Sequence, residues 1–347
     1  MHSLEEDFLQ SLTFSTEKVA TLRKIGEYQG KQELYFHQSP EILRGLQQVA
    51  MIESSESSNR LEGITAPHHR IAKLITHNSA PKDRSEQEIA GYRDALNLIH
   101  QSANHMPFSL DVILQLHSWL YRYLPMQGGK CKTVDNEITE VHPDGHKRVR
   151  FTPSTAFATP MAMEKLIKNY KACVDQRGVE PLIVIPATIL DFLCIHPFRD
   201  GNGRTARLLT LMLLYHYDYQ LGRYISLERI FEESKESYYE TLELSSKGWH
   251  EGKHDLMPWL TYFWGVLLRA YRDFEIRVGT ITHGKGNKAQ HIRRTVENRV
   301  GPFSISDIEQ ACPSVSRDTI RLVLRQLRDE GVITSKGKGR GTKWVQQ

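Results

Sequence analysis

Twelve consecutive residues, HPFRDGNGRTAR from His196 to Arg207, combine the residue types that a nucleotide-polyphosphate site needs. His196 titrates near neutrality, as a general base should. Asp200 offers a hard oxygen ligand, the kind that holds Mg²⁺ together with phosphate groups. Arg204 and Arg207 are three residues apart at the start of a predicted helix, so both guanidinium groups can reach one polyphosphate. The run predicts a site that binds a nucleotide and moves a proton.

The centre of this run has the composition of a tight turn. Gly201 and Gly203 have no Cβ, and they flank Asn202, a residue type that tolerates left-handed backbone. We expect the N–H groups of this turn to point inward and to bind an anion. The helix that follows directs its positive end toward the same space.

Helices are the elements that must position these residues. The segment 182–195 is mostly apolar, and we expect this helix to end just before or at His196 because Pro197 cannot continue it. Apolar residues at helical spacing predict further helices at 40–53, 86–103, 110–123, 159–174, 204–217, 232–245 and 255–278. Trp259 and Trp264 are interpreted as core residues of the last one. The glycine- and proline-bearing segment 125–153 predicts a β-hairpin at about 134–151.

The C-terminal region differs from the rest in charge and in pattern. The net charge is +4, but from Lys288 onward there are 12 lysines and arginines against 6 aspartates and glutamates. The polar segment 282–290 is typical of a linker. Beyond it, a short helix at 304–311, a second helix at 316–330 and two strands around the basic tip KGKGRG follow the order of a winged helix-turn-helix.

A winged helix of this kind suggests DNA as a partner. The second helix would present Arg317, Arg321 and Arg325 to the major groove. The wing would offer phosphate contacts from Lys336, Lys338 and Arg340. Winged helices also bind proteins, so this alternative stays open.

Composition limits the class of protein. With 347 residues, 39% of them hydrophobic and 25% charged, the chain is globular and long enough for two or three domains. Its four cysteines form no CxxC pair, which favours a reducing compartment. The acidic N-terminus does not resemble a signal peptide, and no apolar stretch is long enough to cross a bilayer. We expect a soluble, cytoplasmic protein without a membrane anchor.

The run from His196 to Arg207 resembles the motif HPFx[D/E]GNGRxxR of the Fic (filamentation induced by cAMP) family and matches it at every specified position. The resemblance implies a mainly α fold, a Fic-type helical bundle with a β-hairpin flap. It also implies a protein adenylyltransferase, which moves AMP from ATP to a Ser, Thr or Tyr hydroxyl of a target protein or of itself. The implied roles are base for His196, Mg²⁺ ligand for Asp200, phosphate cradle for Gly201–Gly203, and β- and γ-phosphate ligands for Arg204 and Arg207.

A second segment, Ser58 to Gly63, resembles the inhibitory motif [S/T]xxxE[G/N] of autoinhibited Fic proteins. From the residues alone, Ser58 is expected to cap the start of a helix, and Glu62 to present a carboxylate one turn later. The resemblance implies that Glu62 pairs with Arg207 and prevents the γ-phosphate from seating productively.

Two further features rest on the same resemblance. The hairpin stands where the family has a flap that aligns the target segment by strand addition. Tyr238 and Tyr239 stand where relatives contact adenine, although two tyrosines on a helix also fit a core. Ser246 stands where many relatives have asparagine.

We therefore predict a helical region over 1–105 with the inhibitory motif at 58–63, a Fic catalytic core over 106–280, a linker over 281–290 and a winged helix-turn-helix, a small α+β domain, over 291–347. The predicted activity is adenylyl transfer, held off by Glu62, with ATP and Mg²⁺. A deAMPylating or bifunctional enzyme and an ATP-sensing DNA-binding regulator stay open as alternatives. A target protein is the expected partner, and DNA and a second copy of the chain are further candidates.

Overall fold

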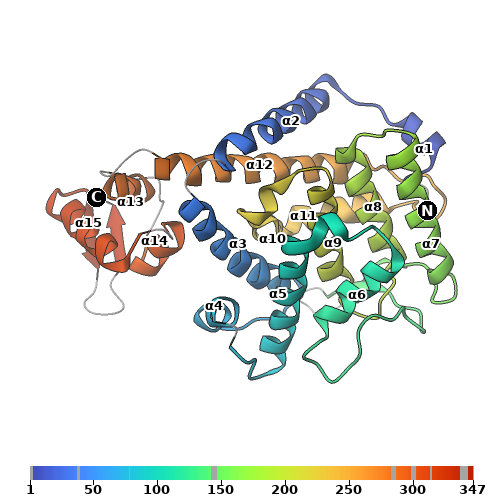
Figure 1. Ribbon diagram of the computed structural model, residues 1–347, viewed down its shortest axis with the longest axis horizontal. Coiled ribbons are helices and arrows are strands. Elements are labelled where there is room, and N and C mark those ends of the chain that lie inside the picture. Colours follow the sequence, from blue (N-terminus) through green and yellow to red (C-terminus); the bar gives the residue numbers. More distant parts are fainter. Residues whose placement is uncertain are drawn as a thin grey trace. The chain divides into compact units, whose positions relative to one another are not determined.

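The computed structural model describes residues 3–36, 40–77, 79–141, 147–282, 287–297, 302–312, 315–336 and 343–346 (Figure 1). These residues are mainly helical. They group into two compact units, one made of Met1–Glu33 and Ala50–Tyr271, the other of Leu34–Val49 and Arg272–Gln347. No helix in the described part of the chain is both long enough and apolar enough for a membrane span.

Three long helices contribute residues to both units: α2 (Thr16–Phe36), α3 (Pro40–Leu61) and α12 (Met257–Thr282). The other helices of the first unit are α1 (Glu6–Ser11), α4 (His68–Thr76), α5 (Arg84–Ser102), α6 (Leu110–Leu120), α7 (Thr159–Lys171), α8 (Pro181–Ile195), α9 (Asn202–His216), α10 (Leu227–Glu233) and α11 (Lys235–Ser246). Short 3₁₀ segments follow α5 and α9, and a π-helical turn follows α7.

Helix α8 is apolar and buried on nearly every side, and it packs against α7, α9 and α11 (Figure 1). Pro186 lies inside it and has no N–H, so the carbonyl of Leu182 has no helical partner. The indole N–H of Trp264 donates to that carbonyl at 2.8 Å, and Trp259 donates to the carbonyl of Pro186 at 2.8 Å. Both tryptophans are buried, which confirms their interpretation as core residues.

The predicted hairpin is present. Strand β1 (Ile138–Val141) pairs antiparallel with β2 (Lys147–Phe151), with Thr139 opposite Val149. Its turn, residues 142–146, lies outside the described residues.

The single helix predicted at 232–245 is wrong, because the structure has two. Helix α10 ends at Glu233, α11 begins at Lys235, and Ser234 between them has φ −113° and ψ 33°. The Ser234 hydroxyl donates to the carbonyl of Ile230 at 2.7 Å. Serine side chains compete with the helical hydrogen-bond ladder in this way, and the chain bends there.

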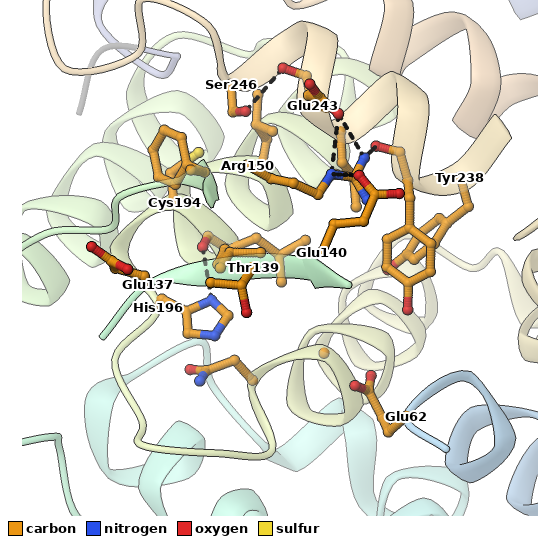
Figure 2. A pocket seen from close by; sticks show the side chains of 18 of the residues that line it. Glu62, Glu137, Thr139, Glu140, Arg150, Cys194, His196, Tyr238, Glu243 and Ser246 are labelled. Atoms are coloured by element: carbon orange, nitrogen blue, oxygen red, sulfur yellow. Dashed lines mark hydrogen bonds and ion pairs between the residues drawn. The ribbon is translucent and has the colours of Figure 1, made fainter. Parts of the chain in front are cut away.

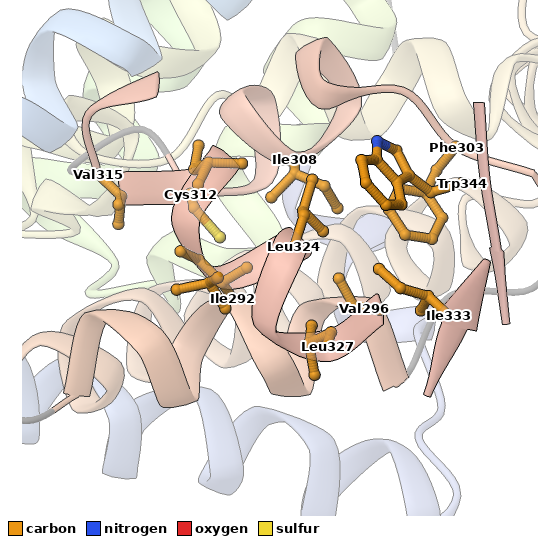
Figure 3. Close-up of a cluster of buried hydrophobic side chains, with 12 residues drawn as sticks. Ile292, Val296, Phe303, Ile308, Cys312, Val315, Leu324, Leu327, Ile333 and Trp344 are labelled. Carbon is orange, nitrogen blue, oxygen red and sulfur yellow. The ribbon is translucent and has the colours of Figure 1, made fainter. Parts of the chain in front are cut away.

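The C-terminal part of the second unit contains α13 (Asn287–Glu297), α14 (Ile305–Ala311), α15 (Arg317–Asp329) and the antiparallel strands β3 (Ile333–Lys336) and β4 (Lys343–Gln346). The Ser316 side chain accepts from the N–H of Thr319 and caps α15. Figure 3 shows the cluster of buried side chains from these elements, including Ile292, Val296 and Trp344. Helix α13 begins inside the predicted linker, since Ile292 and Val296 lie one turn apart and enter this cluster. Residues 283–286 are not among those described.

Helices α5 and α6 approach each other most closely at Gly91. A Cβ on this residue would lie 2.3 Å from the carbonyl oxygen of Leu120 and 2.9 Å from that of Trp119. Both atoms belong to the backbone and cannot move without displacing α6. Glycine at this position therefore allows α6 to lie against α5.

Substitution Gly91→Ala should lower the free energy of unfolding by about 1–3 kcal/mol, the usual range for overpacking. Gly265→Ala on α12 is the matched control, because it is exposed and a Cβ there meets nothing within 4 Å. That control should be neutral or stabilising by ~0.5–1 kcal/mol through helix propensity. Urea unfolding of the three proteins measures both effects, and equal stability of the two variants would contradict the close approach.

Candidate active site

The motif loop between α8 and α9 begins with strained backbone. Helix α8 ends at Ile195, as predicted, and His196 has φ 52° and ψ 60°, in the left-handed region that non-glycine residues rarely adopt. Its N–H still donates to the carbonyl of Phe192 at 2.9 Å. This conformation ends the helix and turns the imidazole into the cavity.

The tautomer of His196 follows from its hydrogen bond. Nδ1 lies 3.2 Å from the carbonyl oxygen of Leu193, and a carbonyl only accepts. Nδ1 therefore carries the proton, which leaves the Nε2 lone pair available. The expectation that His196 titrates near neutrality is wrong, because burial lowers its pKa to about 4 and the ring is neutral near neutral pH. A neutral imidazole with a free Nε2 is the form that can accept a proton.

Two residues before the hairpin hold the motif loop in place. The buried Lys132 donates from Nζ to the carbonyl of Ile195 at 3.2 Å and from its backbone N–H to the carbonyl of Pro197 at 2.8 Å. Asn136 accepts from Lys132 Nζ at 2.7 Å and donates to the carbonyl of Phe198 at 3.1 Å. These contacts over-determine the strained region around His196. The sequence analysis missed both residues.

The turn at Gly201–Gly203, where the loop joins α9, differs in one detail from the expectation. The left-handed residue is Gly201, with φ 81°, whereas Asn202 is already the first residue of α9. The Asn202 side chain accepts from the N–H of Phe198 at 2.9 Å and donates to its carbonyl at 2.8 Å, which ties the two ends of the turn together. Gly201, Asn202 and Gly203 all line the cavity, so the positive end of α9 faces it.

Asp200 presents an exposed carboxylate to the cavity, with 70% of its side chain accessible. The hydroxyl of Tyr121 donates to it at 3.1 Å, and the N–H of Gly201 donates at 2.7 Å. Across the described residues, no group of three His, Cys, Asp or Glu side chains could hold a metal ion by itself. Mg²⁺ usually takes one or two carboxylates and completes its shell with phosphate and water. The single carboxylate of Asp200 fits an ion held in that way.

His117 is a second histidine of the site that the sequence analysis missed. Its Nδ1 accepts from the N–H of Gly129 at 2.8 Å, so its Nε2 carries the proton and donates to the carbonyl of Asp200 at 3.0 Å. The ring stacks on Phe198 with centroids 3.7 Å apart, and burial lowers its pKa to about 4. His117 and Tyr121 are one turn apart on α6 and both hold Asp200. In the sequence, their spacing of four residues, beside the apolar stripe of this helix, is the signal that could have identified them.

The two motif arginines lie in different surroundings. Arg207 lines the cavity, and Arg204 is not among the lining residues. Arg204 is buried and donates to Glu88 on α5 at 2.7 Å, with Asp200 at 3.6 Å. The structure therefore does not bring both guanidinium groups into one open space.

Arg207 is bound by the segment predicted to be inhibitory. It donates to the Glu62 carboxylate at 2.7 Å, to the Ser58 hydroxyl at 2.8 Å and to the Ser58 carbonyl at 2.9 Å. Gly203 makes room for this pair, because a Cβ there would lie 2.3 Å from Glu62 Oε1. The expected pairing of Glu62 with Arg207 is present in the structure.

The expectation that Ser58 caps a helix start is wrong. Ser58 lies inside α3, near its C-terminus, and α3 ends at Leu61. Gly63 has φ 78°, the left-handed conformation that commonly follows a helix end. The helix starts much earlier than the motif suggested, so Ser58 serves as a ligand of Arg207 and Glu62 follows the last helical turn.

The cavity has a volume of about 510 Å³, and its other walls come from the hairpin and from α11. Tyr238, Tyr239 and Ser246 of α11 line it, as the sequence analysis expected for an adenine-contacting region. The Ser246 hydroxyl donates to the carbonyl of Glu243 on its own helix at 3.0 Å. Figure 2 shows β1 running past the His196 ring, with Glu62 entering the cavity from another side.

Comparisons with known proteins agree with this site. The model of the Fic/DOC family matches residues 107–214, which include the whole motif. Protein adenylyltransferase fic-1 of Caenorhabditis elegans is 28% identical over 189 residues, 52% of this chain and 32% of that protein. Protein adenylyltransferase Fic of Drosophila grimshawi is 24% identical over 231 residues, 65% of this chain and 43% of that protein. The chain thus spans less than half the length of these relatives.

Solved structures show the fold. A Fic family protein from Desulfovibrio desulfuricans G20 aligns over 97% of both chains with a TM-score of 0.62 at 20% identity. A fragment of Fic-1 from Caenorhabditis elegans aligns over 75% of this chain and 72% of its own, with a TM-score of 0.57 at 19% identity. The chain therefore has a mainly helical Fic-type fold, and its residues 107–214 match the Fic/DOC family.

The two buried histidines should have opposite tautomers near neutral pH. Long-range proton–nitrogen NMR should find His196 protonated at Nδ1 and His117 protonated at Nε2, because their carbonyl and N–H partners require it. His196→Ala and His117→Gln assign the two signals, and the exposed His105→Gln serves as a control. A proton on Nε2 of His196 would contradict the free lone pair.

Proposed function

We propose that the protein transfers AMP from ATP to a Ser, Thr or Tyr hydroxyl of a target protein or of itself, and that Glu62 restrains this activity. One observation carries the proposal. A neutral histidine with an available Nε2, the positive end of α9 and an exposed carboxylate all face one cavity. The relatives named protein adenylyltransferase agree with this reaction.

The reaction requires His196 to accept a proton. Nε2 takes it from the acceptor hydroxyl, whose oxygen forms a bond to the α-phosphorus of ATP while the bond to pyrophosphate breaks. The Nδ1–H bond to the carbonyl of Leu193 keeps the ring oriented during this transfer. The neutral ring at neutral pH is ready to act as the base.

The N-terminus of α9 and the Asp200 carboxylate would bind the triphosphate of ATP. The first turn of α9 borders the cavity, and the backbone N–H groups of Asn202 and Gly203 suit phosphate oxygens, whereas the N–H of Gly201 already binds Asp200. Asp200 would hold Mg²⁺, which when bound neutralises phosphate charge and helps orient the chain of phosphates. His117 and Tyr121 position Asp200 for this role. Positioning and charge neutralisation supply most of the rate in such chemistry.

The arginines have separate roles in this proposal. Arg207 would bind the γ-phosphate, and Glu62 now occupies its guanidinium at 2.7 Å. A carboxylate at that position excludes a phosphate by occupancy and by charge, and this supports inhibition. Arg204 as a ligand of the β-phosphate region stays a prediction, because its guanidinium now binds Glu88.

Tyr238 and Tyr239 would form the adenine wall, and the hairpin would receive the acceptor segment. Both tyrosines line the cavity, and so do Ile138 to Glu140 of β1. Within the described residues β1 pairs only with β2, so its other edge can take an extended peptide.

Removal of AMP is the alternative that the geometry keeps open. The Glu62 carboxylate borders the same cavity as His196 and is 32% exposed, so it can contact a water molecule there. In that reaction Glu62 would orient the water that attacks the AMP ester. Loss of label from an AMP-modified target with the wild-type protein, but not with Glu62→Gly, would identify this reaction.

For the C-terminal unit we propose a winged helix-turn-helix. The order of α13, α14, α15, β3 and β4 supports it, and so does the backbone pairing of Phe303 with Trp344 beside the hairpin. Binding of DNA by this unit stays a prediction, as does the ATP-sensing regulator that depends on it. Arg317 pairs with Glu309 and Arg321 with Asp318, which reduces the charge they offer to DNA.

Much of the predicted wing lies outside the described residues. Lys338 and Arg340 lie outside the described residues. Lys336 is the last residue of β3, and its side chain is likewise outside the description.

Substitution Glu62→Gly should raise adenylyl transfer by about tenfold or more, the change that ~1.4 kcal/mol of lost inhibition gives. The test incubates the protein with Mg²⁺ and ATP labelled at either the α- or the γ-phosphate. Label retained on protein only from α-labelled ATP is the expected result. Glu56→Gln, on the preceding helix α3, removes a carboxylate that pairs with Arg60, and it should not activate. Retention only from γ-labelled ATP, or no retention at all, would contradict AMP transfer.

Substitution His196→Ala in the Glu62→Gly protein should lower transfer by about 10²–10⁴-fold, the usual effect of losing a general base. Calorimetry should find ATP affinity largely intact, because His196 takes a proton and holds no phosphate. Equal loss of binding and of transfer would show that His196 acts mainly in binding the nucleotide.

A further inference from the structure

The hairpin is joined to α11 by one carboxylate. Glu243 on α11 accepts from Arg150 on β2, with Oε2 lying 2.9 Å from Nη2 and 3.1 Å from Nε. Arg148, two residues earlier on β2, donates to the other oxygen of the same carboxylate. Residues two apart on a strand lie on the same face, so this face of β2 is directed at α11. We call Arg148, Arg150 and Glu243 the flap clamp, of which Figure 2 shows Arg150 and Glu243.

The Arg150–Glu243 pair is partly shielded from water. Each side chain is 16% exposed, so the charges interact more strongly than a fully exposed pair would. Arg150 also donates to the carbonyl of Tyr239 at 2.8 Å, and its guanidinium lies over the Tyr239 ring at 5.6 Å. A planar guanidinium with several fixed partners has little freedom to rotate.

The clamp acts on the middle of the hairpin, and another contact holds its base. Phe151, at the end of β2, stacks on His250 with centroids 5.5 Å apart, and His250 Nε2 contacts the carbonyl of Thr152 at 2.8 Å. This contact leaves the body of the hairpin able to pivot about its base. On α11, Glu243 binds both arginines of this face of β2 and Tyr239 binds Arg150, so Glu243 is the side chain that contacts both arginines and opposes such a pivot.

The clamp connects two walls of the cavity. Tyr239 and Glu243 are four residues apart on α11 and lie on one face of that helix, and both line the cavity. Strand β1, held by β2, lines the same cavity beside His196. Motion of the hairpin relative to α11 would therefore change the distance between an acceptor on β1 and a nucleotide against Tyr239.

We propose that Glu243, acting through Arg150 and Arg148, is a positioning residue that sets the place of the acceptor segment relative to the nucleotide. This inference rests on the proposed function, because it assumes that an acceptor lies along β1 and a nucleotide along α11. Its structural part, that Glu243 holds the hairpin in place, applies to the protein without any ligand. The clamp is thus expected to affect use of the acceptor and to leave binding of ATP unchanged.

The test is a double-mutant cycle with Glu243→Gln, Arg150→Gln and the double variant. Hydrogen exchange on the free protein follows the amides of 138–141 and 147–151, and each single variant should exchange there about tenfold faster. The effect of the double variant should be smaller than the sum of the two single effects, because both changes remove the same Arg150–Glu243 pair. Glu240→Gln on the exposed face of α11 is the matched control and should exchange like the wild type.

The same variants are then placed in the Glu62→Gly protein. Transfer to an acceptor protein should fall about tenfold, while the Kd for ATP measured by calorimetry stays within about twofold. A tenfold weaker Kd with unchanged hairpin exchange would overturn the proposal and make Glu243 a nucleotide ligand. Additive effects in the cycle would also overturn it.

Failure of the inference differs from failure of the proposed function. If no variant transfers label from ATP, adenylyl transfer is wrong, and the exchange experiment still decides whether Glu243 holds the hairpin. If transfer occurs and hairpin exchange is unchanged in Glu243→Gln, the positioning role alone is wrong.

Discussion

The left-handed backbone of His196 is the constraint on which the site depends. Helix α8 is buried on nearly every side, so its end cannot move to accommodate a functional residue, and the chain must turn sharply at one position. The turn directs the imidazole into the cavity and starts α9 six residues later, with its positive end toward the same space. The strain is balanced by backbone contacts from Lys132 and Asn136 and by the stack of His117 on Phe198. These residues make no chemical step, yet they fix where the chemistry can occur.

Burial of the two motif arginines imposes a second constraint. A guanidinium removed from water needs an anion beside it, because an unpaired buried charge is strongly destabilising. Glu88 meets this need for Arg204 from a buried position on α5, with 7% of its side chain exposed. Glu62 meets it for Arg207, but it is 32% exposed and borders the cavity. Under the proposed function, this difference in exposure makes Glu62 the anion that a phosphate would replace. In the proposed mechanism, activation exchanges one anion on Arg207 for another and leaves no buried charge unpaired.

The residues that line the site were easier to predict from the sequence than their geometry. The motif is contiguous, so its residues could be recognised together, and the end of α8 at His196 followed from Pro197. Lys132, His117 and Glu243 act from segments far from the motif along the chain, and their contacts with it exist only after folding. The helical position of Ser58 was missed for a related reason, since a serine can cap a helix or bind a distant arginine. Only the length of α3 decides between these two roles.

The anchoring of α3 limits how inhibition could be released. Ser54 donates to the buried carboxylate of Glu228 at 2.7 Å, and Tyr92 donates to its other oxygen at 2.8 Å. Undocking this part of α3 would leave a buried carboxylate without one of its donors, which is costly. Glu62 lies beyond the last helical residue and directly before Gly63. Gly63 has left-handed backbone here, and a glycine can change its φ and ψ angles more easily than other residues. Moving Glu62 away from Arg207 therefore requires rearranging only the end of the helix, while Ser54 stays bound. A phosphate that competes for Arg207 would have to displace one side chain and its short backbone turn, while the contact of Ser54 on α3 with Glu228 stays in place.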